Sequence, residues 1–231
     1  MKKFWNFADG ESGERTLRIE GIIAEESWIN DEITPKQFRD ELFSGTGDIC
    51  VFVDSPGGDY FCASKIYSDL HEYAAKAGKV TIKIIGLAAS AASVIICAGD
   101  EILIARSGCI MIHNPSCGVN GDSAELDKAK KALESIKNSL VEVYANRTKL
   151  SRQKIAELMT QETWFSSAES IKFGFADGYL EDSAIARYKA QSAAAQVAAT
   201  TQKVFKNFLN KTETSKIKVK ALRRRLFNRN L

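Results

Sequence analysis

Hydrophobic residues along the chain follow two patterns that predict strands. Residues 16–23 alternate apolar and polar positions, as a half-exposed strand does. Other segments are nearly continuous apolar runs rich in Val and Ile, which is typical of parallel strands covered on both faces. Together these patterns predict a sheet whose strands are residues 16–23, 48–54, 80–85, 101–105, 109–112 and 175–180.

Apolar residues that recur three or four positions apart predict helices between these strands. Thr34 and Pro35 suit the N-cap and the first position of a helix that reaches Leu42. The longest amphipathic stretch runs from Ser123 to Lys149, and so long a projecting helix suggests docking on another subunit. The other predicted helices are residues 60–76, 94–98, 151–159 and 168–173.

The order strand, glycine-rich turn, helix, strand over residues 48–85 predicts a βαβ crossover. The turns that follow two parallel strands emerge at the same edge of the sheet. Gly57 and Gly58 in the first turn accept positive φ, so the backbone can turn sharply and expose N–H groups. The second turn, residues 86–93, carries Ser90. We therefore expect an α/β fold in which Gly58 and Ser90 face one crevice.

Ser90 lies between a buried strand and a helix that is apolar on every side. The free N–H groups and positive dipole at a helix start stabilise negative charge, which an acyl-transfer nucleophile requires. Small residues at such a turn also serve close packing, so this segment alone leaves both interpretations open. Ser93 is a weaker candidate, because its N–H lies inside the helix.

The composition is that of a soluble globular protein, with 45% hydrophobic and 26% charged residues among 231. No apolar run approaches the roughly 20 residues that span a bilayer. Acidic residues follow the basic N-terminus too soon for a signal peptide, so we expect a cytoplasmic protein. No C-x-x-C pair and no nucleotide-binding G-x-x-x-x-G-K motif occurs, and we expect reduced thiols, no metal and no cofactor. The cysteines are Cys50, Cys62, Cys97, Cys109 and Cys117.

Charge is distributed unevenly along the chain. Residues 203–231 hold ten Lys or Arg and one Glu, so they carry +9, and residues 1–202 carry −6 of the total +3. Such a tail can contact nucleic acid phosphates, although a solvated tail is the commoner outcome. We expect a flexible arm at residues 1–15, a folded domain at 16–182 and an alanine-rich, then basic, extension at 183–231.

Three motifs resemble the proteolytic subunit of Clp protease, a serine peptidase. They are Ser55–Gly58, Gly86–Ser90 and Met111–Pro115, in this order and within the expected βαβ context. The resemblance covers roughly residues 16–182. It implies a spiral of β-α-β units, the fold shared with crotonases, and heptameric rings, usually two stacked around a proteolytic chamber. Residues 123–149 resemble the handle helix that projects between the rings.

The resemblance also implies catalytic roles. Ser90 corresponds to the nucleophile, and His113 corresponds to the base that takes its proton and later protonates the leaving amine. The backbone N–H groups of Gly58 and Ala91 correspond to the oxyanion hole. His71, the other histidine, lies mid-helix among polar residues and is expected at the surface.

The family binds its substrate as an added strand between the segments that follow the glycine pair and the histidine. The corresponding substrate-binding residues here are Asp59, Tyr60, Ser116, Cys117 and Gly118. For Cys117, a reactive thiol is the alternative to a small apolar filler, which we favour because nothing in the sequence lowers its pKa.

The third triad member departs from the family pattern. The family usually carries Asp shortly before an aromatic residue and Ser-Ala, and we assign Glu162 to that position, ahead of Phe165. A longer carboxylate can still orient an imidazole, and Asp177 is the reserve candidate. Gln161 falls where family members often carry an Arg that locks the two rings together. The sequence therefore does not decide whether this chain forms one ring or two.

Aromatic segments at residues 4–7 and 28–32 resemble the related proteins of prophages, which are associated with phage head maturation. A C-terminal extension fits that setting as a scaffold-like or capsid-binding segment. The expected partners are a polypeptide substrate, further copies of this chain, and either an ATP-dependent unfoldase or phage capsid proteins, with no membrane. The alternatives are a crotonase-like acyl-CoA enzyme and a non-enzymatic phage assembly module.

Overall fold

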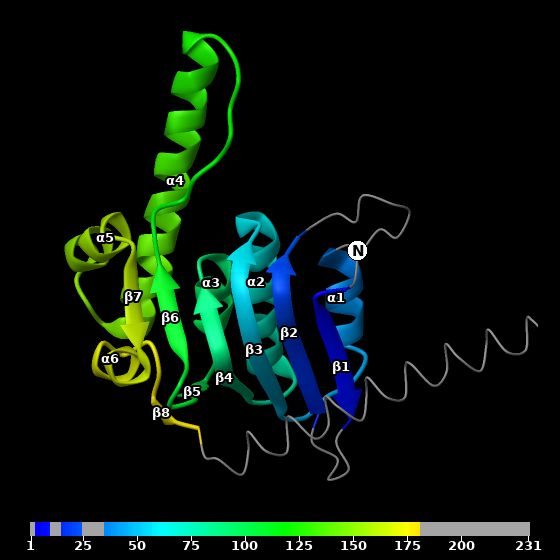
Figure 1. Cartoon of the computed structure of the whole chain (residues 1–231). Coiled ribbons are helices and arrows are strands. Elements are labelled where there is room, and N and C mark those ends of the chain that lie inside the picture. The colour runs from blue at the N-terminus through cyan, green and yellow to red at the C-terminus, as the bar shows by residue number, and fades with distance from the viewer. Residues whose placement is uncertain (1–2, 10–14, 25–34, 181–231) are drawn as a thin grey trace, which may run out of the picture. The chain divides into compact units, whose positions relative to one another are not determined.

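The computed structural model describes residues 3–9, 15–24 and 35–180, and the predicted C-terminal extension lies outside them. Within these residues eight strands form one sheet, ordered β1-β2-β3-β4-β5-β8, with β6 and β7 branching from β4 (Figure 1). β1 is antiparallel to β2 and β7 to β6, whereas the other pairs are parallel. The bounds are β1 Trp5–Asp9, β2 Arg15–Ile23, β3 Ile49–Gly58, β4 Val80–Ala89, β5 Glu101–Ile104, β6 Cys109–Ile112, β7 Thr163–Ser166 and β8 Gly178–Tyr179.

β4 is the strand at which the sheet branches. Its first half pairs with β5 through Thr81–Ile84, and its second half pairs with β6 through Leu87–Ala89. Because β6 supplies a new ladder partner, β4 continues beyond the predicted end at Ile85. β3 likewise runs through the predicted glycine turn to Gly58, pairing there with Ile23. Both strands therefore carry their carboxyl ends to one edge of the sheet.

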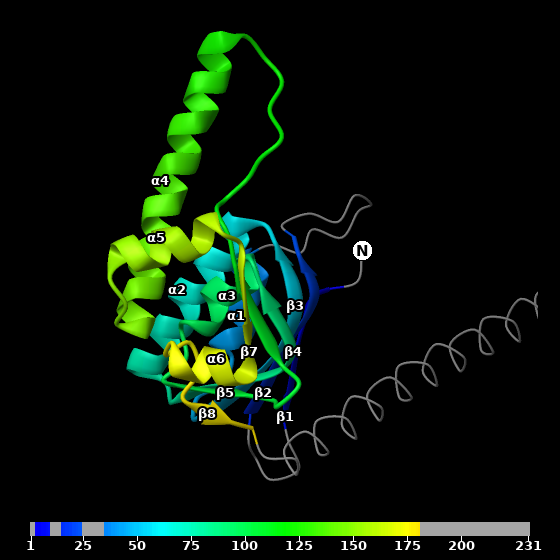
Figure 2. The same cartoon turned by 60° about the vertical axis from the view of Figure 1, so that its left-hand side comes forward.

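Three helices cover one face of this sheet (Figure 2): α1 (Pro35–Leu42), α2 (Tyr60–Lys76) and α3 (Ala91–Ile96). Asp59 caps α2 by accepting a hydrogen bond from the Cys62 N–H at 2.7 Å. The apolar stripe of α2 is buried, including Ile66 and Leu70. Every residue of α3 is buried, which explains why its sequence has no polar face.

The predicted long helix is present as α4 (Ser123–Thr148), which projects from the sheet and its covering helices (Figures 1 and 2). A capping box starts it, in which Asp122 accepts from the Glu125 N–H and Glu125 accepts from the Asp122 N–H, both at 3.0 Å. The buried residues of α4 lie in its last turns, and near its start Leu126 is 48% exposed.

Two further helices flank β7: α5 (Arg152–Thr160) and α6 (Ser167–Lys172). Ser151 caps α5 as predicted, accepting from the Lys154 N–H at 3.2 Å. The sequence pattern did not indicate β7, because only one of its four residues, Phe165, is buried. None of the described helices is long and apolar enough to cross a membrane.

The expectation of a flexible arm over residues 1–15 is wrong for residues 5–9, which form β1 along the edge of β2. The cause is aromatic burial. Phe4 and Trp5 are buried, and the Trp5 ring packs edge-on against Phe38 of α1 with centroids 5.5 Å apart. The Trp5 indole N–H also donates to Glu41 at 3.0 Å.

Candidate active site

Ser90 forms the junction between β4 and α3. Its backbone has φ 53° and ψ −123°, a conformation that side-chain-bearing residues rarely adopt. Its N–H donates to the carbonyl of Met111 on β6 at 2.9 Å, so the branch at β4 fixes the position of this residue. The junction places the Ser90 side chain at the start of α3, where backbone N–H groups have no partner within the helix.

His113 directly follows β6 and is only partly buried. Its Nε2 lies 2.7 Å from Oγ of Ser90, within hydrogen-bonding distance. When Nε2 is unprotonated, Ser90 donates this hydrogen bond, which is the arrangement from which a hydroxyl passes its proton to imidazole. The two residues that sequence motifs placed at the centre of the site are therefore in contact.

The glycine pair lies against this junction. Gly57 has φ +94°, and a Cβ built on it would lie 2.8 Å from both Cβ of Ser90 and N of Ala91. Gly58 has φ +147°, and a Cβ there would lie 2.0 Å from the carbonyl oxygen of Ile23. Both positions therefore require glycine, for backbone conformation and for close approach.

A cavity of about 390 Å³ opens in front of Ser90 and His113. Of the predicted substrate-binding residues, Asp59, Tyr60, Ser116 and Cys117 line it, whereas Gly118 does not. Gly58 and Ala91, the predicted oxyanion donors, line it as well. Its remaining wall is mostly apolar and comes largely from α4; it consists of Phe61, Val94, Pro115, Ala129, Ala132, Leu133, Ile136, Leu140 and Tyr144.

Sequence reasoning did not identify the contribution of α4 to this cavity. Leu133, Ile136 and Leu140 recur at helical spacing in the long amphipathic stretch, for which the sequence suggests docking on another subunit, and here they line the cavity. The apolar spacing of these three residues was the one sequence signal that could have indicated this contact. The sequence pattern does not show the path of residues 113–122. These residues connect β6 to the start of α4, which lines the cavity beside the site.

Glu162 is exposed and has a left-handed backbone with φ 49°. Its carboxylate accepts a hydrogen bond from the Trp164 indole at 3.4 Å. Among the described residues, no carboxylate bonds to the His113 ring. Asp177, the reserve candidate, is used elsewhere, because it accepts from the Ile102 N–H at 2.7 Å and pairs with Arg147 at 2.6 Å.

Ser93, the alternative nucleophile, is fully buried in α3. Its Oγ donates to the carbonyl of Ser90 at 2.5 Å and lies 2.7 Å from the Tyr144 hydroxyl. Beside it, Cys97 donates to the carbonyl of Ser93, and burial raises the pKa of the Cys97 thiol to about 12. Neither buried group is placed to attack a substrate.

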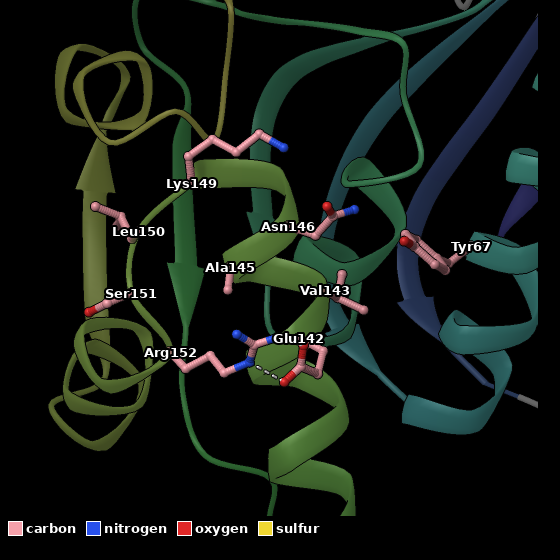
Figure 3. A pocket seen from close by; sticks show the side chains of 9 residues that line it. All are labelled: Tyr67, Glu142, Val143, Ala145, Asn146, Lys149, Leu150, Ser151 and Arg152. Atoms are coloured by element: carbon pink, nitrogen blue, oxygen red, sulfur yellow. Dashed lines mark hydrogen bonds and ion pairs between the residues drawn. The ribbon is translucent and has the colours of Figure 1, made fainter.

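A second hollow, of about 540 Å³, lies between α2, α4 and the start of α5 (Figure 3). Arg152 closes one side by donating to Glu142 at 2.6 Å, and Tyr67 faces the hollow from α2. None of the predicted site residues lines it. Within the part of the chain that the structure describes, no three His, Cys, Asp or Glu side chains gather as a metal site.

Comparison with known proteins agrees with the motifs. A family model described as Clp protease matches residues 15–183. Proteolytic subunit 1 of the ATP-dependent Clp protease from Chlamydia abortus is 32% identical over 190 residues, which cover 75% of this chain and 96% of that protein. The proteolytic subunit from Deinococcus radiodurans is 26% identical over 58% of this chain and 65% of its own length.

Subunit 3 from Rhodococcus jostii is 31% identical over 56% of this chain and 64% of its own length. The match thus spans just under two thirds of the Deinococcus and Rhodococcus relatives. The mixed α/β sheet agrees with the Clp protease fold. Since the family model covers well over half of the chain, including every strand from β2 to β8, this chain belongs to the Clp protease family.

Proposed function

We propose that this chain is a serine endopeptidase and acts as the proteolytic subunit of a Clp-type protease. The observation that carries the proposal is the 2.7 Å contact between Oγ of Ser90 and Nε2 of His113 at the mouth of a cavity. Family membership supports the same reaction class. A crotonase-like acyl-CoA enzyme is not favoured, because that chemistry does not need a serine bonded to a histidine.

In the proposed reaction, Oγ of Ser90 attacks the peptide carbonyl carbon while Nε2 of His113 takes the hydroxyl proton. The carbonyl oxygen becomes an oxyanion that accepts hydrogen bonds from the N–H groups of Gly58 and Ala91. Each such donor typically contributes about 3–4 kcal/mol to the transition state. The C–N bond then breaks and His113 gives its proton to the leaving amine. Water, deprotonated by His113, releases the acyl group from Ser90.

We assign Glu162 the role of orienting His113. The β6–β7 register supports this assignment, because Ile112 at the end of β6 pairs with Thr163 at the start of β7, and His113 and Glu162 are the residues just beyond this pair. For this role the Glu162 carboxylate has to give up its hydrogen bond to Trp164 and accept one from the His113 imidazole. The free-energy cost is small, because the bond to Trp164 is long and exposed to solvent.

The substrate is proposed to bind as an extended peptide between Asp59-Tyr60 and residues 116–118. The cavity wall supports this, since both segments contribute to it, one through Asp59 and Tyr60 and the other through Ser116 and Cys117. Backbone hydrogen bonds would then hold the peptide, and the cavity would receive one side chain.

The partners follow from the same proposal. The relatives from Deinococcus and Chlamydia are named as proteolytic subunits of the ATP-dependent Clp protease, and we propose that this chain likewise forms cytoplasmic rings that work with an ATP-dependent unfoldase. The exposed Leu126 near the start of α4 suits a contact with another subunit. A prophage setting, in which capsid proteins are the substrates, rests on the aromatic segments at residues 4–7 and 28–32.

Hydrolysis of a set of fluorogenic peptides by the purified chain tests the proposal. Ser90→Ala and His113→Ala should each abolish cleavage, while Ser68→Ala, which removes an exposed hydroxyl on α2, should leave it unchanged. Cleavage that survives in Ser90→Ala would refute the assignment.

A further inference from the structure

The backbone of Ser90 is strained, because residues that carry a side chain rarely adopt its φ of 53° and ψ of −123°, so neighbouring groups have to hold it in place. Its N–H is held by Met111. Its carbonyl oxygen accepts two hydrogen bonds, from the N–H of Ser93 at 2.9 Å and from the Oγ of Ser93 at 2.5 Å. Ser93 is therefore the residue that restrains the carbonyl side of the nucleophile.

The hydroxyl of Ser93 is itself held by Tyr144 of α4. A serine hydroxyl has one hydrogen, and that of Ser93 is used on the Ser90 carbonyl. The Tyr144 hydroxyl must therefore donate to Ser93, over 2.7 Å. Both groups are buried, with exposed fractions of 0% and 1%, so water cannot replace either one. Burial also raises the pKa of Tyr144, which keeps this donor protonated.

The Tyr144 ring is fixed in turn. It packs edge-on against Phe175 with centroids 5.8 Å apart, and it lines the cavity in front of Ser90. The chain of donors thus runs from α4, through α3, to the backbone of the residue whose Oγ contacts His113.

We propose that Ser93 and Tyr144 are positioning residues for Ser90: their two hydroxyls hold its carbonyl so that Oγ stays aimed at His113. This inference rests on the proposed function of Ser90 as nucleophile. Without the pair, the Ser90 carbonyl keeps one donor of two, and the backbone can relax toward an ordinary conformation. A displacement of about 1 Å at a reacting group can cost about a hundredfold in rate.

The test uses the full chain and three variants: Ser93→Ala, Tyr144→Phe, and the two combined. The readouts are the rate constant for acylation of Ser90 by a fluorophosphonate, and kcat and KM for a fluorogenic peptide. Each single variant should slow acylation and kcat by at least about tenfold with KM within threefold. The double variant should be no slower than Ser93→Ala, because Tyr144 acts through Ser93.

Two matched variants remove the same groups far from Ser90. Tyr73→Phe deletes a buried phenol hydroxyl that donates to Gly47, and Ser170→Ala deletes a buried hydroxyl that donates to Ser166. Both should lower the melting temperature about as much as the site variants, without slowing acylation.

The inference is overturned if folded Ser93→Ala and Tyr144→Phe react within twofold of the parent, or if the matched variants slow acylation equally. Failure of the proposed function looks different, because the parent itself would then take up no label at Ser90. That result would remove both proposals together.

Discussion

Ser90 shows how a single residue is positioned by what surrounds it. Its disfavoured backbone is held by Met111 on one side and by Ser93 on the other, and its Oγ is received by His113. Because Gly57 has no Cβ, its backbone can lie directly against this turn. Backbone strain that the surrounding structure maintains is typical of functional sites. Here it holds the Ser90 hydroxyl in a fixed position beside His113, as a preorganised nucleophile requires.

The proposed role of Glu162 can be tested by a single substitution. Glu162→Gln removes the charge that would orient and stabilise the His113 imidazolium, so kcat should fall by about a hundredfold or more with KM little changed. Trp164→Phe removes the indole that holds the carboxylate away, and it should leave kcat unchanged or higher. Full activity in Glu162→Gln would show that Ser90 and His113 work without this carboxylate.

Gly58 gives a prediction about stability. In Gly58→Ala the new Cβ meets the Ile23 carbonyl at 2.0 Å, and we expect a loss on the order of 3 kcal/mol or more of unfolding free energy in urea titrations. Gly47→Ala is the control that separates backbone strain from crowding. Gly47 also has a positive φ, +95°, but a Cβ there would have no atom within 4 Å, so this variant should lose only about 1 kcal/mol of unfolding free energy. Equal losses in the two variants would contradict the crowding argument.

Among the elements, α1 and α2 are tied by charge as well as by packing. Arg39 of α1 donates to Asp69 at 2.6 Å and to Glu72 at 2.7 and 2.9 Å. Asp69 is 1% exposed and also pairs with Lys65, so its buried carboxylate depends on these two cations.

This ion-pair cluster predicts an acid dependence. Hydrogen bonds from Arg39 and then Lys76 lower the pKa of Glu72 from 4.5 to about 2. A carboxyl whose folded pKa is lowered stabilises the fold above its unfolded pKa, and that contribution is lost as pH falls from about 4.5 toward 2. Urea unfolding at pH 6.5 and pH 3.5 should therefore show a smaller drop for Glu72→Gln than for the parent.

Glu134→Gln, at an exposed position on α4, is the control and should drop as the parent does. An equal drop in parent and Glu72→Gln would show that this ion pair does not couple to folding.

The sequence predicted most elements because their patterns are local. The apolar runs of β3 and β4 and the stripe of α2 are visible in any window, and three motifs indicated Ser90, His113 and Gly58. β7 was missed because one buried residue in four leaves no pattern. The pairing of Ser93 with Tyr144 was missed because the two residues are 51 positions apart, and only the packing of α4 on α3 brings them together.

At the scale of the whole molecule, the long helix lines the cavity and is also the element on which the proposed assembly depends. Its inner face closes the cavity through Leu133, Ile136 and Leu140, while Leu126 remains exposed near its start. An exposed leucine on a projecting helix is a natural contact for another subunit. The proposed assembly and the cavity wall therefore belong to one element.

The assembly can be measured directly. Light scattering should give a mass of seven or fourteen times the 25.5 kDa chain. If α4 joins two rings, Leu126→Asp should shift fourteen copies to seven, because a charge would be buried at that contact. A monomer in the parent, at the concentrations used for peptide cleavage, would contradict the proposed rings.

The most direct test of the central claim is to identify the residue that a fluorophosphonate modifies. The intact chain is labelled, digested and mapped by mass spectrometry. The account predicts one adduct, on Ser90, that is absent from Ser90→Ala and greatly reduced in His113→Ala. An unmodified chain, or an adduct on any other serine, would contradict it.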